Sequence, residues 1–115
     1  MKMKTIYLAG GSSFTSPEGR DYVASLSDRS FVEEPRLFGS LLPAIEHARS
    51  RIGQPVHGGT ITGAKVVAIE PRSKRFPCYC GPAIAIAAYI DRDRSVTRVR
   101  PRRWRPTTMD DGGAQ

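Results

Sequence analysis

The sequence predicts a single α+β domain in which a small antiparallel sheet of β-β-α-β type is packed by one main helix. Three observations support this fold class. The chain of 115 residues has the length of one modest domain. One segment spaces its apolar residues for a helix, and the other apolar segments are short, β-prone and separated by turn residues. We place the domain at residues 1–100 and a basic arm with a flexible tail at residues 101–115.

The helix is predicted over residues 41–52. Ser40 stands directly before it and can cap its first backbone N–H groups. Pro43 falls in the first turn, where a missing N–H is harmless, and Gly53 and Pro55 end the helix. The predicted apolar face consists of Leu41, Leu42, Ile45, Ala48 and Ile52.

Strands are predicted where short apolar segments lie between turn residues. The opening segment "KTIYLA" leads into "GGSSFTSPEGR", which we interpret as a hairpin or loop, and "QPVHGGTITG" is predicted as a second loop. The predicted strands are residues 4–9, residues 21–26, a short edge strand within 30–38 that Pro35 interrupts, and residues 64–71.

Residues 83–90, "AIAIAAYI", fit two structures. Ile84, Ile86 and Ile90 share one parity, which favours a strand, whereas the alanines and the preceding Gly-Pro also suit a short helix. We favour a strand, paired through the turn "DRDR" with residues 95–100.

Positive charge is concentrated in the second part of the chain. Residues 1–71 hold eight basic and seven acidic side chains, whereas residues 72–115 hold ten basic and four acidic ones. Nearly all of the net charge of +7 therefore comes after residue 71. This asymmetry indicates an anionic partner.

The segment "RVRPRRWRP", residues 98–106, is the strongest candidate binding site. Guanidinium groups form paired hydrogen bonds with phosphate or carboxylate groups, and an indole that lies between them in the sequence can stack on a base. The alternative is that the arginines form a solvated end of the domain and the tryptophan anchors the core. The candidate binding residues here are Arg98, Arg100, Arg102, Arg103, Trp104 and Arg105.

A second basic cluster is formed by Arg72, Lys74 and Arg75. With Phe76 and Tyr79 it has the basic and aromatic mixture of nucleic-acid-binding surfaces. The alternative is an ordinary charged turn between strands.

Sites for catalysis or metal binding have weaker support. Cys78 and Cys80, with His47 and His57, offer four zinc ligands, but a one-residue gap between cysteines strains a shared tetrahedron. We expect reduced thiols that pack a loop; a small enzyme with a thiolate near Arg75 is the alternative. The segment "AGGSS" lacks the pattern of a nucleophile elbow and the lysine of a phosphate loop. We therefore expect a non-enzymatic protein with no metal and no cofactor.

The sequence indicates a cytoplasmic protein without membrane contact. No apolar run approaches the roughly 18–20 residues that span a bilayer. The N-terminal "MKMKTIYLAGG" is basic and then apolar, but its apolar part of about five residues is shorter than the roughly 7–15 of a signal peptide.

The segment "RLFGSLLPAIEHARSRIG…AKVVAIEP", residues 36–71, joins an aromatic edge, a predicted serine-capped helix that contains alanines, and a buried strand. It resembles the small β-β-α-β proteins encoded by phages and prophages, including anti-CRISPR proteins. The resemblance implies an inhibitor of host defence machinery. Many such inhibitors are acidic mimics of nucleic acid, whereas this chain is basic, so the resemblance implies docking on an acidic surface or on the nucleic acid of a nucleoprotein complex.

Two functions follow from the sequence. The first is a non-enzymatic binding protein whose basic C-terminal half contacts nucleic acid or a nucleoprotein complex. The alternative is a phage-derived protein–protein inhibitor that docks on an acidic protein surface.

Overall fold

The structure is a computed structural model, and it describes residues 5–25, 29–70 and 83–99. In these residues an antiparallel sheet is packed by one helix, so the domain is α+β as predicted. The predicted arm at residues 101–115 lies outside the described residues. The elements in chain order are β1 (Ile6–Thr15), β2 (Asp21–Val23), β3 (Arg36–Phe38), α1 (Leu41–Arg51), β4 (Pro55–Val56), β5 (Gly59–Glu70), β6 (Ala83–Ile90) and β7 (Val96–Arg98).

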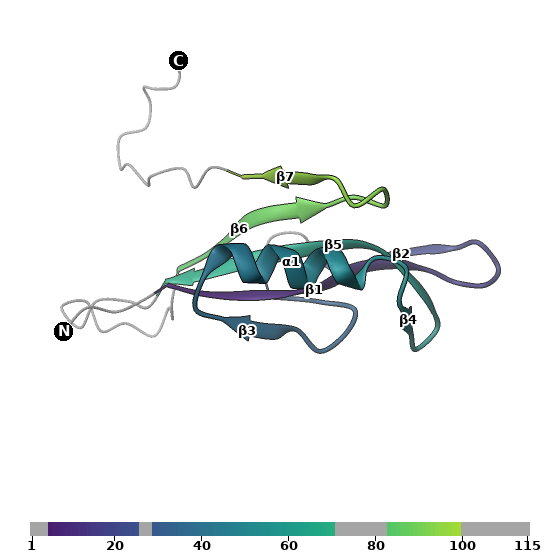
Figure 1. The fold of residues 1–115 in the computed structure, drawn as a ribbon. Helices are drawn as coiled ribbons and strands as arrows, with labels where there is room; N and C mark the ends of the chain where they lie inside the picture. The colour runs from purple at the N-terminus through teal and green to yellow at the C-terminus, as the bar shows by residue number, and fades with distance from the viewer. Residues whose placement is uncertain (1–4, 26–28, 71–82, 100–115) are drawn as a thin grey trace, which may run out of the picture.

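The sheet has the order β2-β1-β5-β6-β7, with β3 paired to β1 and β4 paired to β5 (Figure 1). The long strands β1 and β5 form its centre and pair from Ile6 opposite Ile69 to Thr15 opposite Thr60. The domain therefore has more strands than the predicted β-β-α-β arrangement, because the central pair carries short strands on its flanks.

Parts of two segments that we predicted as a hairpin or loop and as a loop lie within strands, and β1 and β2 pair as an antiparallel hairpin across the first of them. β1 continues through "GGSSFT" to Thr15, and β5 begins at Gly59 rather than at residue 64. The glycines here allow close packing instead of a turn. A Cβ at Gly11 would lie 2.9 Å from Ile61 Cδ1, and one at Gly59 would lie 2.2 Å from the Thr15 carbonyl oxygen. Irregularities in register beside Ser13 accommodate this packing.

The outer edge of β1 is covered by three successive segments. β3 pairs with residues 7–9, and β2 pairs with residues 13–15. Between them, the Gly11 carbonyl accepts a hydrogen bond from the Val32 N–H (3.0 Å), and the Gly11 N–H donates to the Glu33 carboxylate (2.7 Å). Such cover keeps the edge of a central strand from pairing with another chain.

Helix α1 has nearly the predicted bounds. Ser40 occupies the N-cap position, but its side chain makes no capping hydrogen bond. The helix ends before Gly53, whose φ of +89° is a conformation that glycine adopts without strain. Leu42 was wrongly assigned to the buried face and is 64% exposed, because it points away from the sheet; Ala44 is buried instead. Within the described residues, no helix combines the length and apolar character needed to cross a bilayer.

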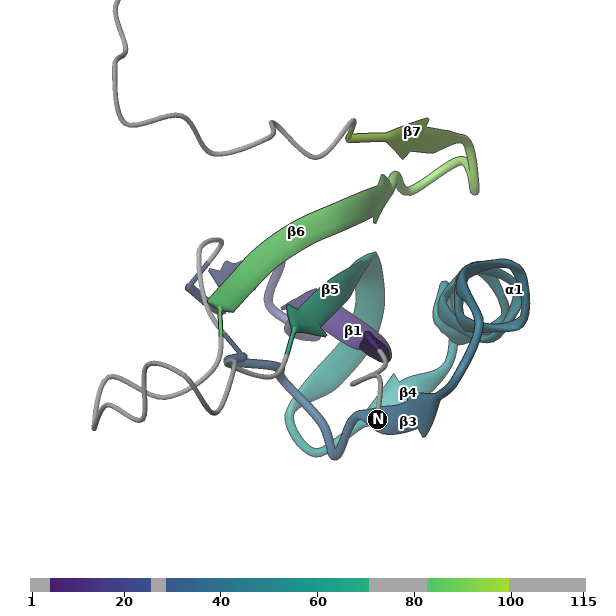
Figure 2. The same cartoon turned by 90° about the vertical axis from the view of Figure 1, so that its left-hand side faces the viewer.

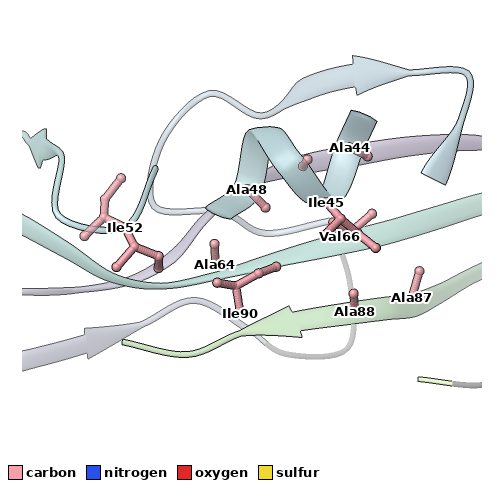
Figure 3. Packing of buried hydrophobic residues seen from close by; sticks show 11 residues of the cluster. Ala44, Ile45, Ala48, Ile52, Ala64, Val66, Ala87, Ala88 and Ile90 are labelled. Atoms are coloured by element: carbon pink, nitrogen blue, oxygen red, sulfur yellow. The ribbon is translucent and has the colours of Figure 1, made fainter. Parts of the chain in front are cut away.

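The core lies between α1 and one face of the sheet (Figure 3). Small side chains dominate it, which lets the helix approach the strands closely. Ile45 of α1 and Ile52, which directly follows it, belong to one cluster with Val66 and Ile90, and several alanines fill most of the remaining positions. These alanines are Ala9, Ala44, Ala48, Ala64, Ala87 and Ala88.

The face of the sheet opposite α1 buries a lysine. Lys65 lies between Ala64 and Val66, which face the helix, so strand alternation directs Lys65 to the other face. Its side chain is fully buried, its Nζ donates to the Ser25 carbonyl, and it lies 5.0 Å from the centroid of the Phe31 ring. Ser25 and Phe31, on either side of residues 26–28 in the sequence, therefore lie on the side of the sheet away from α1. Figure 2 shows α1 beside β1 and β5.

Strands β6 and β7 form a hairpin at one edge of the sheet, so residues 83–90 are a strand and the helical alternative is wrong. β7 is shorter than the predicted 95–100. Val99 still donates its N–H to the Ala87 carbonyl (2.9 Å). Two residues further the same ladder would need an N–H at position 101, where the sequence has a proline.

Candidate functional site

Of the nine predicted binding residues, the described part of the chain contains Arg98. It is exposed at the end of β7, opposite Ala88 of β6. Because Ala88 belongs to the core under α1, Arg98 lies on the helix side of the sheet. The remaining predicted residues fall outside the described ranges: Arg72, Lys74, Arg75, Arg100, Arg102, Arg103, Trp104 and Arg105.

The positive charge is divided unequally between the described domain and the rest of the chain. Residues 5–25, 29–70 and 83–99 contain nine basic and eight acidic side chains, a net charge of +1. The segments 1–4, 26–28, 71–82 and 100–115 contain nine basic and three acidic ones, a net charge of +6. Most of the net positive charge of the chain therefore lies outside the described ranges.

The strand ends that flank the basic segments lie close together in the sheet. Ile6, at the start of β1, is paired with Ile69 near the end of β5. Glu70, at the end of β5, is paired with Ala83 at the start of β6. β7 is antiparallel to β6 and runs toward the same end of the sheet (Figure 1). Segments 1–4 and 71–82 therefore attach at one end of the sheet, and the strand that precedes residues 100–115 points toward it.

Four of the eight arginines that the structure describes have a hydrogen-bond or ion-pair partner for the guanidinium group among the described residues. The strongest pair joins Arg51 to Glu33, with an Nη2–Oε1 distance of 2.6 Å and two further contacts from Nε. Such bidentate pairs fix side-chain geometry as well as charge. The other contacts are Arg49 with Glu46 (3.5 Å), Arg92 with Asp21 (3.9 Å) and Arg94 with the Ile52 carbonyl (3.2 Å).

Sequence reasoning missed a second group of basic side chains, which lies between β3 and α1. The Arg36 Cζ is 5.8 Å from the centroid of the Phe38 ring, and the His47 ring is 5.5 Å from the same centroid. Arg51 is four residues after His47 and shares its side of the helix. The four-residue spacing was visible in the sequence, but the position of Arg36 depends on how β3 packs beside α1.

Two arginines influence the ionisation of His47. Partial burial lowers the pKa of His47 below its ordinary value of 6.5, and the charges of Arg36 and Arg51 lower this pKa further. The Glu33 carboxylate acts in the opposite direction, but the net change is downward. The space around this imidazole is therefore electropositive.

The weaker alternatives of the sequence gain no support from the described residues. In the ranges that the structure describes, no three His, Cys, Asp or Glu side chains form a group suited to a metal ion. His47 lies on α1 and His57 lies between β4 and β5, while Cys78 and Cys80 fall outside the described ranges. The Ser13 hydroxyl contacts the Thr62 hydroxyl (3.4 Å), a pairing between two neighbouring strands.

Comparisons with protein-family models, with curated protein sequences and with solved structures give no match to this chain.

Proposed function

We propose that this protein is a non-enzymatic binding protein that contacts nucleic acid, alone or in a nucleoprotein complex, through its basic segments. The separation of charge carries this proposal: the described domain has a net charge of +1 and the remaining segments have +6. Segments in which arginine and lysine outnumber acidic residues this strongly are suited to contacts with phosphate groups.

The placement of the strand ends adds a geometric argument. Ile6, Glu70 and Ala83 lie on neighbouring strands at one end of the sheet, where segments 1–4 and 71–82 are attached, and the strand before residues 100–115 runs toward this end. Basic groups that start from one place can engage one stretch of phosphate backbone together. In this proposal Arg72, Lys74, Arg75, Arg98, Arg100, Arg102, Arg103 and Arg105 contact phosphates, and Trp104 stacks on a base.

Fluorescence anisotropy with labelled single-stranded and double-stranded oligonucleotides tests the proposal. For the full chain, the logarithm of the binding constant should fall linearly with the logarithm of the salt concentration, because each phosphate contact releases counterions. A chain ending at residue 100 should bind more weakly and with a shallower slope. Absence of binding at low salt would refute the proposal.

The second candidate is a protein–protein inhibitor that docks on an acidic protein surface. The resemblance to small phage-encoded proteins implies a phage origin for such an inhibitor. The observation that favours it is the exposure of Leu37 (60%) and Leu42 (64%) on either side of the β3–α1 connection. Exposed apolar side chains of this size are typical of protein contacts when they cluster. Partner capture that persists after nuclease treatment and is lost in Leu42→Asp would favour this candidate.

A further inference from the structure

A small basic group on the described domain has unused hydrogen-bonding capacity. β3 directly precedes α1, and the two elements pack against each other, so Arg36 and His47 both lie beside the Phe38 ring. Arg51 follows on the next turn of the helix. Three nitrogen-bearing side chains from two elements therefore border one region of the surface.

The polar atoms in this group are only partly satisfied. Among the described residues, the Arg36 guanidinium contacts the Phe38 ring but makes no hydrogen bond or ion pair, and the His47 imidazole makes none either. Arg51 uses Nε and Nη2 on Glu33, which leaves its Nη1 for another acceptor. A ligand that offers several acceptor oxygens in a compact form would match these donors.

The electrostatics of the group select an anion. Arg36 from β3 and Arg51 from α1 both lower the pKa of His47, and Glu33 from the preceding segment opposes them without cancelling their effect. Glu46 precedes His47 in the helix, but its carboxylate lies 3.5 Å from Arg49. Positive potential therefore exceeds negative potential at the imidazole.

We propose that Arg36, His47 and Arg51 form a binding site for a phosphate group. The two arginines supply forked donors, and His47 becomes a further cationic donor when it takes up a proton. The site does not depend on the proposed function, because its side chains all belong to the described domain and to neither predicted basic cluster. A phosphate held there would attract the His47 proton, so binding strengthens as the pH falls through the range in which His47 titrates.

Nuclear magnetic resonance of the two histidine rings in the full chain tests the site. The rings are titrated with pH in sodium chloride and in sodium sulfate at equal ionic strength, because sulfate keeps its double charge throughout. We expect sulfate to raise the His47 midpoint by at least about 0.3 pH units while the His57 midpoint moves little. His57 is exposed between β4 and β5 and serves as the internal reference.

Two variants connect the shift to the site. Arg36→Gln should raise the His47 midpoint in chloride, because a charge that lowers it is removed, and should abolish most of the sulfate effect. Arg20→Gln removes the same charge from the exposed β1–β2 turn and should leave both midpoints unchanged. If Arg36→Gln perturbs the spectrum as a whole, Arg36→Lys preserves the charge and should retain part of the shift.

A second titration uses a short oligodeoxythymidylate in place of sulfate, and it distinguishes a nucleic-acid phosphate from a free oxyanion. A selective His47 shift with either anion supports the site and identifies the form of phosphate that it accepts. Equal shifts of His47 and His57, or no shift with either anion, would overturn it. Failure of oligonucleotide binding by anisotropy with a retained sulfate shift would reject the proposed function and leave this site standing.

Discussion

Arg94, in the turn between β6 and β7, donates from its guanidinium to the backbone carbonyl of Ile52, the residue that follows α1. The distance is 3.2 Å, and in return the Arg94 carbonyl accepts a hydrogen bond from Arg49 Nε (3.3 Å). Arg94 also has a φ of +69°, a left-handed conformation that favours glycine. An arginine at such a position indicates that its side-chain contact compensates for the backbone strain.

This arrangement predicts an order of stability for two substitutions. Arg94→Ala loses the side-chain contact and retains the left-handed strain, so we expect it to lower the free energy of unfolding by about 1–2 kcal/mol. Arg94→Gly loses the same contact but relieves the strain, and it should be about 1 kcal/mol more stable than the alanine variant. Urea denaturation measures both, and a glycine variant less stable than the alanine variant would contradict the interpretation.

Glu33 joins three parts of the domain, since its carboxylate accepts from the Gly11 N–H of β1 and from Arg51 of α1. Glu33→Gln removes the charge from both contacts, and we expect a loss of about 1–3 kcal/mol in the free energy of unfolding. The adjacent Glu34 is exposed, so Glu34→Gln is the matched control and should change stability by less than about 0.5 kcal/mol. Equal effects of the two substitutions would show that the Glu33 contacts do not stabilise the domain.

Lys65 combines a buried hydrocarbon stem with an ammonium group that bonds the Ser25 carbonyl. Lys65→Met preserves most of the packing volume, whereas Lys65→Ala leaves a cavity under the segment between β2 and β3. We therefore expect the alanine variant to be at least about 1 kcal/mol less stable than the methionine variant. Thermal or chemical unfolding of the two proteins decides this, and indistinguishable stabilities would mean that the stem of Lys65 contributes little to packing.

The lowered pKa of His47 makes the stability of the domain depend on pH. Below about 6.5 the unfolded chain takes up a proton at this histidine before the folded chain does, so acidification favours unfolding. The stability that neutral His47 contributes is present above pH 6.5 and is lost as the pH falls toward the lower pKa of the folded state. Unfolding curves over this range should lose part of their pH dependence in His47→Gln, and an unchanged pH dependence in this variant would contradict the interpretation.

Local patterns were sufficient for some elements and insufficient for others. The helix spacing from Leu41 to Ile52 reflects burial on one face, so α1 was predicted with nearly correct bounds. Residues 83–90 are a strand, but their isoleucines do not share one face. An irregularity in register pairs Ile90 with Ala64, which belongs to the core under α1, and Ile86 with Val67, which does not. The glycines at 10, 11, 59 and 63 were misinterpreted, because their role in close packing depends on partners such as Ile61 that are remote in sequence.

The candidate sites show the same division. The basic clusters were visible as composition, and the structure adds where their flanking strands end. The Arg36–His47–Arg51 group was not predictable, because it depends on the packing of β3 against α1. The burial of Lys65 was equally hidden, since a lysine within a strand is ordinarily expected at the surface.

We propose that the basic segments supply most of the charged contacts with a polyanion. Three variants that each lose three positive charges test it by oligonucleotide binding over a salt series. In the first variant, glutamine replaces Arg72, Lys74 and Arg75, and in the second it replaces Arg102, Arg103 and Arg105. In the control, glutamine replaces Arg20, Arg29 and Arg92 of the described domain. We expect the slope of the logarithm of the binding constant against the logarithm of the salt concentration to fall in magnitude by about 2–3 in the first two variants and to stay nearly unchanged in the control. Equal losses in all three variants, or a loss confined to the control, would contradict the claim.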